Sequence, residues 1–420
     1  MSILVLHTSN ASRRKHLAKA VQYARRHGER LLLIVKNPTW ETDLVDRVFA
    51  ADTTNIEQTV AAAKELAASE TEPIHAVVAF VEHSVPAAAA VAAHFGLPFV
   101  SPETAYAARD KYVMRTRFAE AGVAQPGFGL ARTEDEALKE AARIGYPLVL
   151  KPLIGGGSMY VRRVDDDAEL VEHFAMIRRG AWDGFDYDPL YESARRTYDG
   201  AILLEAYVHG GEISVESIVA DGRTHVVAIH DKPLPMHGPY FEEVYYATPT
   251  DLPPAQVARI TELTDAAHRA LGITTGATHT EFRIRPDGDP MILETAARLG
   301  GGPIYRSVLF STGVDMVEAV LDVSLGRTPD LTPPRPVVPI GFYLFFAERA
   351  GTITEVHGFE EAEADPRVKE VDLYRKVGDQ VNVPPHVWQA HGHVIFTAER
   401  RDGLGEVFDE LVKTVRLDVE

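Results

Sequence analysis

The chain of 420 residues contains no cysteine. This absence excludes disulfides, metal sites with thiolate ligands and cysteine catalysis. Long apolar runs are also missing, since none approaches the roughly 20 residues that cross a bilayer. Positive charge is scarce: 43 Lys and Arg stand against 61 Asp and Glu, a formal net charge of −18. This balance argues against nucleic acid as the main partner. We expect a cytoplasmic protein without membrane contacts.

Two common nucleotide-binding motifs are absent as well. The turn after the first apolar run, residues 7–10, is not G-x-G-x-x-G, and G-x-x-x-x-G-K-[ST] occurs nowhere. A dinucleotide site in that turn and a P-loop are therefore not expected. With 45% hydrophobic and 25% charged residues the composition is that of a globular protein. A chain of this length predicts two to four domains.

The first domain is predicted over residues 1–102. Strand-like runs at residues 3–6, 31–35 and 75–81 alternate with helical stretches, two of which are stopped by Gly28 and Gly96. Alternating strands and helices predict an α/β domain, a Rossmann-like parallel sheet with helices on both faces.

A second region is predicted over residues 103–335 and a C-terminal α+β domain over residues 336–420. The proline-rich stretch 329–339 suggests a linker between them. Residues 130–207 read as a small αβ lobe, followed by strands and one long helix over residues 254–271. Within the lobe, residues 182–198 are aromatic and acidic without clean periodicity, which predicts a surface insertion or mobile segment.

A glycine loop joins two strand-like runs of the small lobe. Gly155, Gly156, Gly157 and Ser158 follow the run that contains Lys151. Glycine backbone can turn several N–H groups toward one point, an arrangement that suits phosphate oxygens. The alternative is a flexible hairpin tip beside a surface lysine.

Two carboxylates are predicted to face each other across a hairpin. The turn at residues 286–289 joins a strand containing Glu281 to a strand ending at Glu294. If Arg285 pairs with Pro290, then Glu281 pairs with Glu294, with Cβ atoms about 5 Å apart. Opposed like charges need a neutralising partner, and oxygen ligands favour Mg²⁺. In the alternative, both lie on a solvated face balanced by arginines.

These segments together resemble the ATP-grasp carboxylate–amine ligases over nearly the whole chain, most of all the bacterial L-amino-acid (dipeptide) ligases. The segments that carry the resemblance are Asp110–Arg115, Lys151–Pro152, Gly155–Ser158, Glu205–Glu212, Glu281 and Glu294–Gly302. The resemblance implies an ATP-grasp fold, in which ATP lies between two lobes of the central region and residues 130–207 act as a mobile lid.

The resemblance also assigns roles to single residues. Lys111 and Lys151 would contact the phosphates under the Gly155–Ser158 flap. Glu205, Ala206 and Val208 would read the adenine, and Glu212 would hold the ribose. Glu281 and Glu294 would hold one or two Mg²⁺, with Mn²⁺ as a substitute. The family commonly has Asn where this chain has Ala296, so one metal would be held more weakly or through water.

The implied reaction is that of an ATP-dependent ligase. An amino-acid carboxylate attacks the γ-phosphate, and the amine of a second amino acid then displaces phosphate from the acyl phosphate. The product would be a dipeptide or a γ-glutamyl-type amide. Arg298 would clamp the acyl phosphate or the substrate carboxylate, with an ion pair to Glu281 or Glu294 as the alternative. Lys232 would add charge near the phosphates.

Substrate contacts are predicted at a few further positions. Glu82 follows a strand at its carboxyl end, where open sheets bind ligands. Glu243 is a second candidate for an ammonium group, with Tyr246 where dipeptide ligases often have His. Gly301 and Gly302 would leave room for a large donor beside Arg298. The resemblance is also compatible with a homodimer.

Two other functions compete with the amino-acid ligase. A biotin-carboxylase-like or purine-pathway carboxylase would use bicarbonate as the acid. A non-catalytic nucleotide-binding protein would keep the fold without turnover, which the five charged residues at positions 111, 151, 281, 294 and 298 argue against.

Overall fold

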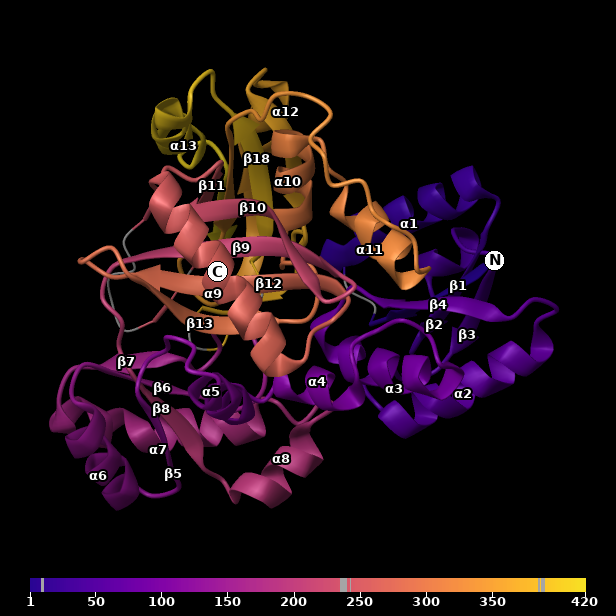
Figure 1. The fold of residues 1–420 in the computed structure, drawn as a ribbon. Coiled ribbons are helices and arrows are strands. Elements are labelled where there is room, and N and C mark those ends of the chain that lie inside the picture. The colour runs from indigo at the N-terminus through magenta and orange to yellow at the C-terminus, as the bar shows by residue number, and fades with distance from the viewer. Residues whose placement is uncertain (9–10, 235–239, 242, 384–385, 387–389) are drawn as a thin grey trace.

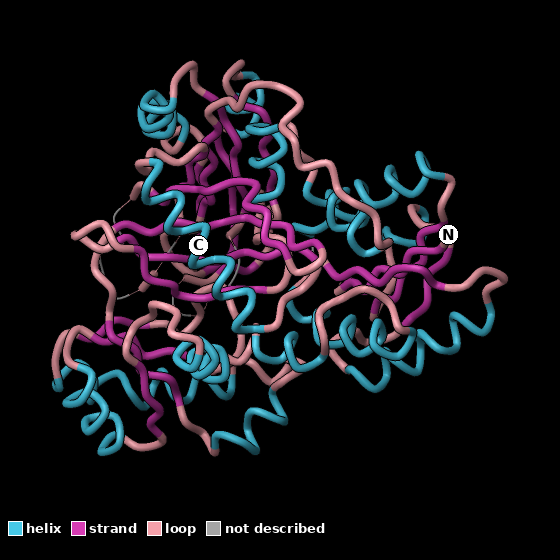
Figure 2. The backbone as a smooth tube through the Cα atoms, viewed as in Figure 1, coloured by secondary structure: helices cyan, strands magenta, loops and turns pink. Residues whose placement is uncertain are grey.

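The computed structural model describes residues 1–8, 11–234, 240–241, 243–383, 386 and 390–420. The architecture is mixed α/β, with an N-terminal unit, a small lobe and a large sheet that runs into the C-terminal region (Figure 1). Strands fill the interior and helices cover the outside (Figure 2). No helix among these residues is both long and apolar enough to cross a bilayer.

The N-terminal unit is a parallel sheet, as predicted, and it has four strands. Its strands are β1 (Ser2–His7), β2 (Arg30–Val35), β3 (Arg47–Ala50) and β4 (Ile74–Ala79), in the order β3-β2-β1-β4. The short edge strand β3 was not predicted. The helices α2 (Ile56–Ser69) and α3 (Val85–Phe95) pack on one face, and α1 (Arg14–His27) packs on the other (Figure 1). Gly28 and Gly96 end α1 and α3 in the left-handed conformation.

The small lobe has an antiparallel sheet in the order β5-β8-β6-β7. Its strands are β5 (Phe128–Ala131), β6 (Leu148–Lys151), β7 (Arg162–Val164) and β8 (Ile202–Ala206), and its helices are α6 (Glu134–Ile144), α7 (Asp167–Asp183) and α8 (Tyr191–Tyr198). Residues 182–198, for which the sequence predicts a surface insertion or mobile segment, contain the end of α7 and the helix α8. Ala194 and Tyr198 of α8 and the preceding Leu190 are buried, and they share a hydrophobic cluster with Phe185 and Leu203.

The large sheet has eight strands in the order β13-β12-β9-β10-β11-β14-β18-β16. They are β9 (Gly211–Ala220), β10 (Arg223–Lys232), β11 (Tyr245–Thr248), β12 (Gly276–Ile284), β13 (Pro290–Ala296), β14 (Ile340–Phe345), β16 (Val368–Leu373) and β18 (Gly392–Thr397). Helix α9 (Pro254–Leu271) has the predicted bounds. The boundary that we place at residue 336 therefore falls within one continuous sheet, because β14, β16 and β18 extend it.

The remaining elements connect the units or cap the C-terminal region. They are α4 (Pro102–Ala107), α5 (Lys111–Glu120), α10 (Ile304–Thr312), α11 (Met316–Ser324), α12 (Phe359–Ala364), α13 (Leu404–Leu411), β15 (Gly351–His357), β17 (Gln380–Val381), β19 (Arg416–Val419) and the 3₁₀ turns Ala11–Arg13, Trp40–Asp43, Glu82–Ser84 and Arg401–Gly403. Strands β15, β17 and β19 form a small separate sheet.

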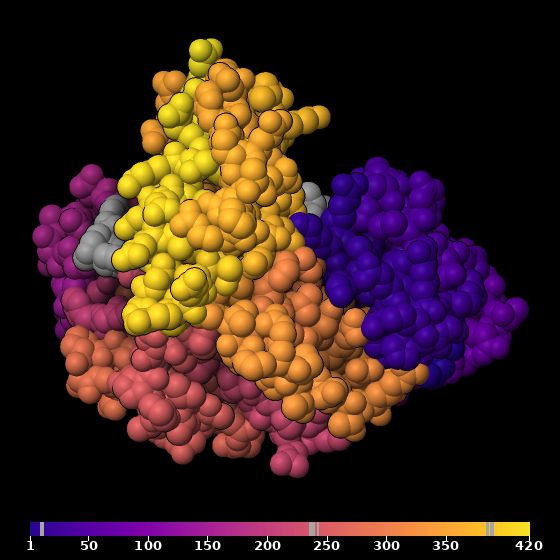
Figure 3. Space-filling view, turned by 90° about the horizontal axis from the view of Figure 1, so that it is seen from above, coloured from indigo at the N-terminus to yellow at the C-terminus, as the bar shows by residue number. Residues whose placement is uncertain are grey.

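Packing joins the N-terminal sheet firmly to the large sheet. Leu4 shares a hydrophobic cluster with Val215, and Val5 shares another with Tyr305 and Met316. Lys15 of α1 also bonds Glu370 of β16 at 2.8 Å. Indigo N-terminal residues and yellow C-terminal residues are both exposed on the face of the molecule that Figure 3 shows. The small lobe has a hydrophobic cluster of its own, and a second cluster joins it to Tyr106 and Tyr112.

Candidate active site

One cavity of ≈ 320 Å³ lies between the small lobe and the large sheet. It brings together nearly all the side chains that the sequence singled out, from segments up to 220 residues apart. Those that line it are Glu82, Lys111, Lys151, Gly155, Gly156, Gly157, Ser158, Glu205, Ala206, Val208, Glu212, Glu243, Tyr246, Glu281, Glu294, Arg298, Gly301 and Gly302. Lys232 is not part of the lining; it lies buried behind three of these carboxylates.

The glycine flap covers one end of the cavity between β6 and β7. Gly155 and Gly157 have positive φ angles of 91° and 67°, which favour glycine. Lys111, the first residue of α5, donates from Nζ to the carbonyl oxygen of Gly155 at 3.1 Å. The flap and the lysine at the helix start therefore face the same space, where phosphate oxygens could be bound.

The flap conformation gives a matched pair of substitutions. A Cβ at Gly155 would overlap the Phe185 ring and force a side chain to φ +91°, whereas a Cβ at Gly156 meets nothing within 4 Å. We expect Gly155→Ala to raise the KM for ATP on the order of 10-fold, since backbone strain of this kind is worth about 1–3 kcal/mol. Gly156→Ala should change it less than about twofold. Steady-state kinetics checks both; equal effects would show that the flap geometry is irrelevant.

Glu205 is held by two cations at the end of β8. Its Oε1 accepts from Nε of Arg115 at 2.6 Å, and its Oε2 accepts from Nζ of Lys151 at 2.7 Å. Burial raises the pKa of the Glu205 carboxyl, but the two cations outweigh it and bring the pKa to about 2. Burial also lowers the pKa of Lys151. Arg115 had no assigned role, although it stands one helical turn after Lys111 on α5.

The predicted carboxylate pair is present on β12 and β13. Glu281 and Glu294 are direct partners across the antiparallel ladder, and both side chains reach the cavity. The predicted hairpin end is wrong, because Pro290 pairs with Ile284 and not with Arg285. A bulge between Glu281 and Phe282 absorbs the difference of one residue, so the two carboxylates still meet.

Lys232 gathers three carboxylates at the base of the cavity. Its Nζ bonds Glu212 at 2.5 Å, Glu281 at 2.9 Å and also Glu243. Burial lowers the pKa of Lys232, but the three carboxylates reverse this and raise the pKa well above its usual value. The hydroxyl of Tyr246 donates to the other oxygen of Glu243. Glu212 and Glu243 are therefore already bonded within the protein, and a ligand that used them would share them with Lys232.

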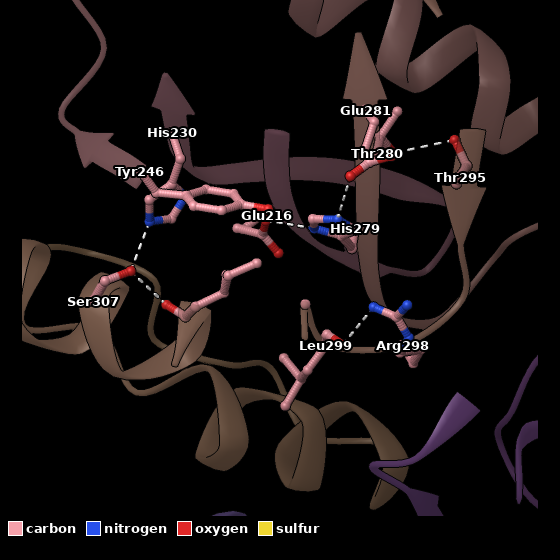
Figure 4. A network of polar contacts seen from close by, with 12 residues as sticks. Glu216, His230, Tyr246, His279, Thr280, Glu281, Thr295, Arg298, Leu299 and Ser307 are labelled. Atoms are coloured by element: carbon pink, nitrogen blue, oxygen red, sulfur yellow. Dashed lines mark hydrogen bonds and ion pairs between the residues drawn. The ribbon is translucent and has the colours of Figure 1, made fainter. Parts of the chain in front are cut away.

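A histidine that the sequence did not mark orients Glu281. His279 lies between Glu216 and Glu281, with Nδ1 at 2.6 Å from Glu216 Oε1 and Nε2 at 3.3 Å from Glu281 Oε1 (Figure 4). Burial lowers the pKa of His279, but Glu216 and Glu281 raise it to about 10. The ring therefore carries a proton on each nitrogen at neutral pH and donates to both carboxylates. Residues of one strand alternate in direction, so His279 and Glu281 share a face.

Arg298, which also lines the cavity, forms an ion pair with a different partner from those predicted. Its Nε donates to Glu82, and Glu82 also contacts Nη1 of Arg109 at 3.1 Å. Burial raises the pKa of Glu82, yet the two arginines bring it down to about 2. Glu82 thus holds Arg298 in place, and its charge is balanced within the protein. This pairing makes Glu82 a weaker candidate for a substrate ammonium group.

The carboxylates of this site fit a divalent cation. Among the described residues, the only cation within 4.0 Å of Glu294 is Lys111 Nζ, at 3.9 Å, and the Glu294 side chain is 32% exposed. Oε2 of Glu281 has no donor within the same part of the chain, since Lys232 and His279 both bond Oε1. Two opposed carboxylates with open oxygens are a donor set suited to Mg²⁺ or Mn²⁺. Ala296 offers no further oxygen from its side chain.

Comparison with known proteins points to one family. A family model described as an ATP-grasp domain matches residues 144–305, and one described as L-amino acid ligase C-terminal domain 2 matches residues 343–420. The chain is 30% identical to alanine–anticapsin ligase of Bacillus subtilis over 56% of its own length and 51% of that protein. It is 24% identical to the L-arginine-specific L-amino acid ligase of Bacillus subtilis, over 74% of this chain and 72% of the relative.

Among solved structures, that of an L-amino acid ligase from Bacillus licheniformis has a TM-score of 0.81 with 25% identity. The match covers 100% of this chain and 98% of that structure. The chain spans about half the length of alanine–anticapsin ligase.

Proposed function

Because the chain belongs to the ATP-grasp carboxylate–amine ligases, we propose that it joins two amino acids through an acyl phosphate. One oxygen of the donor carboxylate attacks the γ-phosphorus of ATP, and ADP leaves. The amine nitrogen of the acceptor then attacks the acyl carbon, phosphate leaves with the bonding electrons, and the nitrogen gives up a proton. The products are an amide, ADP and phosphate.

The observation that carries the proposal is the set of charges that meet in one cavity. Lys111, Lys151, Glu281, Glu294 and Arg298 all line it together with the glycine flap, and Lys111 Nζ lies 3.9 Å from Glu294. We propose that the lysines and the flap bind the phosphates and that Glu281 and Glu294 hold the divalent cation. The cation would neutralise charge on the transferring phosphoryl group.

The remaining assignments follow from position in the same cavity. We propose that Glu205, Ala206 and Val208 face the adenine and that Glu212 faces the ribose, with Lys232 and Arg283 balancing Glu212. Arg298 would bind the reacting carboxylate and later the acyl phosphate, held in its orientation by Glu82. Residues 130–207 would close over the acyl phosphate and exclude water.

Several features favour this ligase over a bicarbonate-dependent carboxylase. The C-terminal match is to an amino-acid ligase domain, and the relatives named above are amino-acid ligases. Gly301 and Gly302 line the cavity beside Arg298, and a Cβ at Gly301 would meet nothing within 4 Å. Open space there suits an acid with a side chain better than it suits bicarbonate.

A phosphate-release screen with Mg-ATP tests the proposal. The twenty amino acids are supplied singly and in pairs, and the products are identified by mass spectrometry. We expect phosphate release that depends on the amino acids, with one product per phosphate whose mass is the sum of the two minus water. Release with bicarbonate alone would identify a carboxylase instead. No nucleotide consumption across the panel would contradict both enzymes.

A further inference from the structure

Arg13 lines the same cavity and lies in the turn between β1 and α1. It is 6% exposed and lines the cavity together with Arg298 and Tyr374. The turn follows the carboxyl end of a central strand of the parallel sheet, which is the edge where open α/β sheets bind ligands. The family resemblance gives this residue no role.

The partners of Arg13 are neutral. Its Nη1 donates to Nε2 of His16 at 3.1 Å and to the carbonyl oxygen of Gly300 at 3.0 Å. Burial, and then the charge of Arg13, lower the pKa of His16 well below its usual value, so this ring is uncharged. Within the described part of the chain, no carboxylate lies within 4.0 Å of the guanidinium, and Nε and Nη2 have no acceptor.

The other buried arginines around the cavity are paired differently. Arg109 pairs with Asp188 and Glu82, Arg115 with Glu205, and Arg298 with Glu82. Buried charges in proteins are ordinarily paired, because an unpaired one loses its hydration without compensation. Burial and the like charge of Arg298 lower the pKa of Arg13 to about 10. The charge of Glu82 raises the pKa of Arg13 in turn, but among the described residues no carboxylate forms an ion pair with this buried cation in the cavity wall.

We propose that Arg13 binds a second carboxylate of the substrates, one that is not phosphorylated. This inference rests on the proposed ligase function and narrows its substrate class. A guanidinium binds a carboxylate with two parallel hydrogen bonds, and Nε and Nη2 form one such fork. The carboxylate comes from the acceptor's α-carboxyl group or from the side chain of an acidic amino acid. Both sources present the same anion to the same site.

A structural role would have a different signature. If Arg13 served only to tie the N-terminal turn to Gly300, its loss would lower stability and affect all substrates equally. If it binds a carboxylate, its loss should abolish discrimination between an acid and the matching amide. The comparison of acids with amides therefore separates the two roles even when a variant is less stable.

The experiment compares wild type, Arg13→Gln, Arg13→Lys and the control Arg14→Gln. Arg14 is the next residue, is exposed and lies outside the cavity lining. With the donor amino acid held fixed, one arm compares each active acceptor amino acid with its α-carboxamide, and the other arm compares glutamate with glutamine and aspartate with asparagine. Phosphate release gives kcat and KM for every member. The shift of the melting temperature with the same compounds and MgADP gives binding without turnover.

In one arm we expect the kcat/KM of wild type to be about 100-fold higher for the acid than for the amide. Charge-assisted hydrogen bonds between a carboxylate and a guanidinium contribute a difference of this size. Arg13→Gln should lose that preference because its KM for the acid rises, while its KM for ATP stays unchanged. Arg13→Lys should restore part of it, and Arg14→Gln should behave as wild type. The arm that responds identifies the source of the carboxylate.

An acid preference that survives in Arg13→Gln, or its absence from wild type in both arms, would overturn the inference. If wild type releases no phosphate with any pair, the ligase proposal fails by itself. The melting shifts then decide about Arg13. An acid-specific shift that disappears in Arg13→Gln supports carboxylate binding, and no such shift contradicts it.

Discussion

Glu294→Gln should reduce ATP-dependent phosphate release about 1,000-fold or more, because a carboxylate that holds the cation beside transferring phosphates contributes several kcal/mol to the transition state. The amide keeps the shape of the side chain and removes its charge. Glu294 has one weak ion pair in the described structure, to Lys111 at 3.9 Å. The folded protein should therefore keep its melting temperature to within about 2 °C, and the loss of rate can be assigned to the cation.

Glu281→Gln should lose as much activity and also some stability. Its Oε1 accepts hydrogen bonds from Lys232 and from the His279 imidazolium. Removal of one member of a buried ion pair lowers the free energy of unfolding by about 3–5 kcal/mol. The two variants thus separate metal binding from the surrounding network. The measurements are initial rates at increasing Mg²⁺ and Mn²⁺, calorimetric titration of Mn²⁺, and thermal unfolding in EDTA.

Glu355→Gln is the matched control. Glu355 lies with His357 and Asp418 in the other group of the described structure whose ligand atoms are all within 4.8 Å of one another. That group is in the C-terminal region, outside the cavity lining. We expect wild-type activity and metal dependence for this variant. A Glu294→Gln protein with wild-type turnover and unchanged apparent affinity for Mg²⁺ would refute the proposed metal site.

Local signals in the sequence were enough for most of the elements. The long helix α9 begins and ends where proline and Gly272 place it, and alternation of strands with helices predicts the parallel sheet. The helix α8 was missed because its eight residues bury Ala194 and Tyr198 among aromatic groups from other elements. Such burial is a tertiary effect that periodicity over so short a segment does not reveal.

For the site, the sequence predicted which residues converge but not how their charges are balanced. The predicted strand register was wrong by one residue at the turn. Glu281 and Glu294 are nevertheless paired, because a bulge between Glu281 and Phe282 shifts the register by one residue. The partners of Arg298 and Arg13, namely Glu82 and the carbonyl of Gly300, lie 216 and 287 residues away. No local pattern encodes contacts at such separations. They also determine the property on which the inference about Arg13 rests, namely that no described carboxylate forms an ion pair with it.

Lys232→Met should make folding depend on a divalent cation. In the absence of metal we expect the free energy of unfolding to fall by about 3–5 kcal/mol, since a buried charge network loses its central partner. The carboxylates of Glu212, Glu243 and Glu281 have ligand atoms within 4.8 Å of one another. Without the ammonium group, these oxygens repel each other in a buried space and form a donor set for Mg²⁺ or Mn²⁺.

The measurement is urea unfolding of wild type and Lys232→Met in EDTA and at increasing Mg²⁺, with Lys139→Met as control. Lys139 is exposed on α6, so its loss should change the free energy of unfolding by less than about 0.5 kcal/mol. Ligand linkage predicts that metal at 100 times its Kd restores about 2.7 kcal/mol to the Lys232 variant. Turnover should stay low even then, because a metal ion in place of the ammonium group would hold Glu212 and Glu281 in a different arrangement.

The same experiment distinguishes two explanations of the buried lysine. If Lys232 acts as a fixed cation that organises Glu212, Glu243 and Glu281, only its variant should gain stability from metal beyond the gain of wild type. If the carboxylates instead take up protons when the lysine is removed, Mg²⁺ should raise the free energy of unfolding of the variant and of wild type by the same amount. An equal gain would mean that these three side chains do not form a cation site, and that the metal belongs to Glu294 and the open oxygen of Glu281 alone.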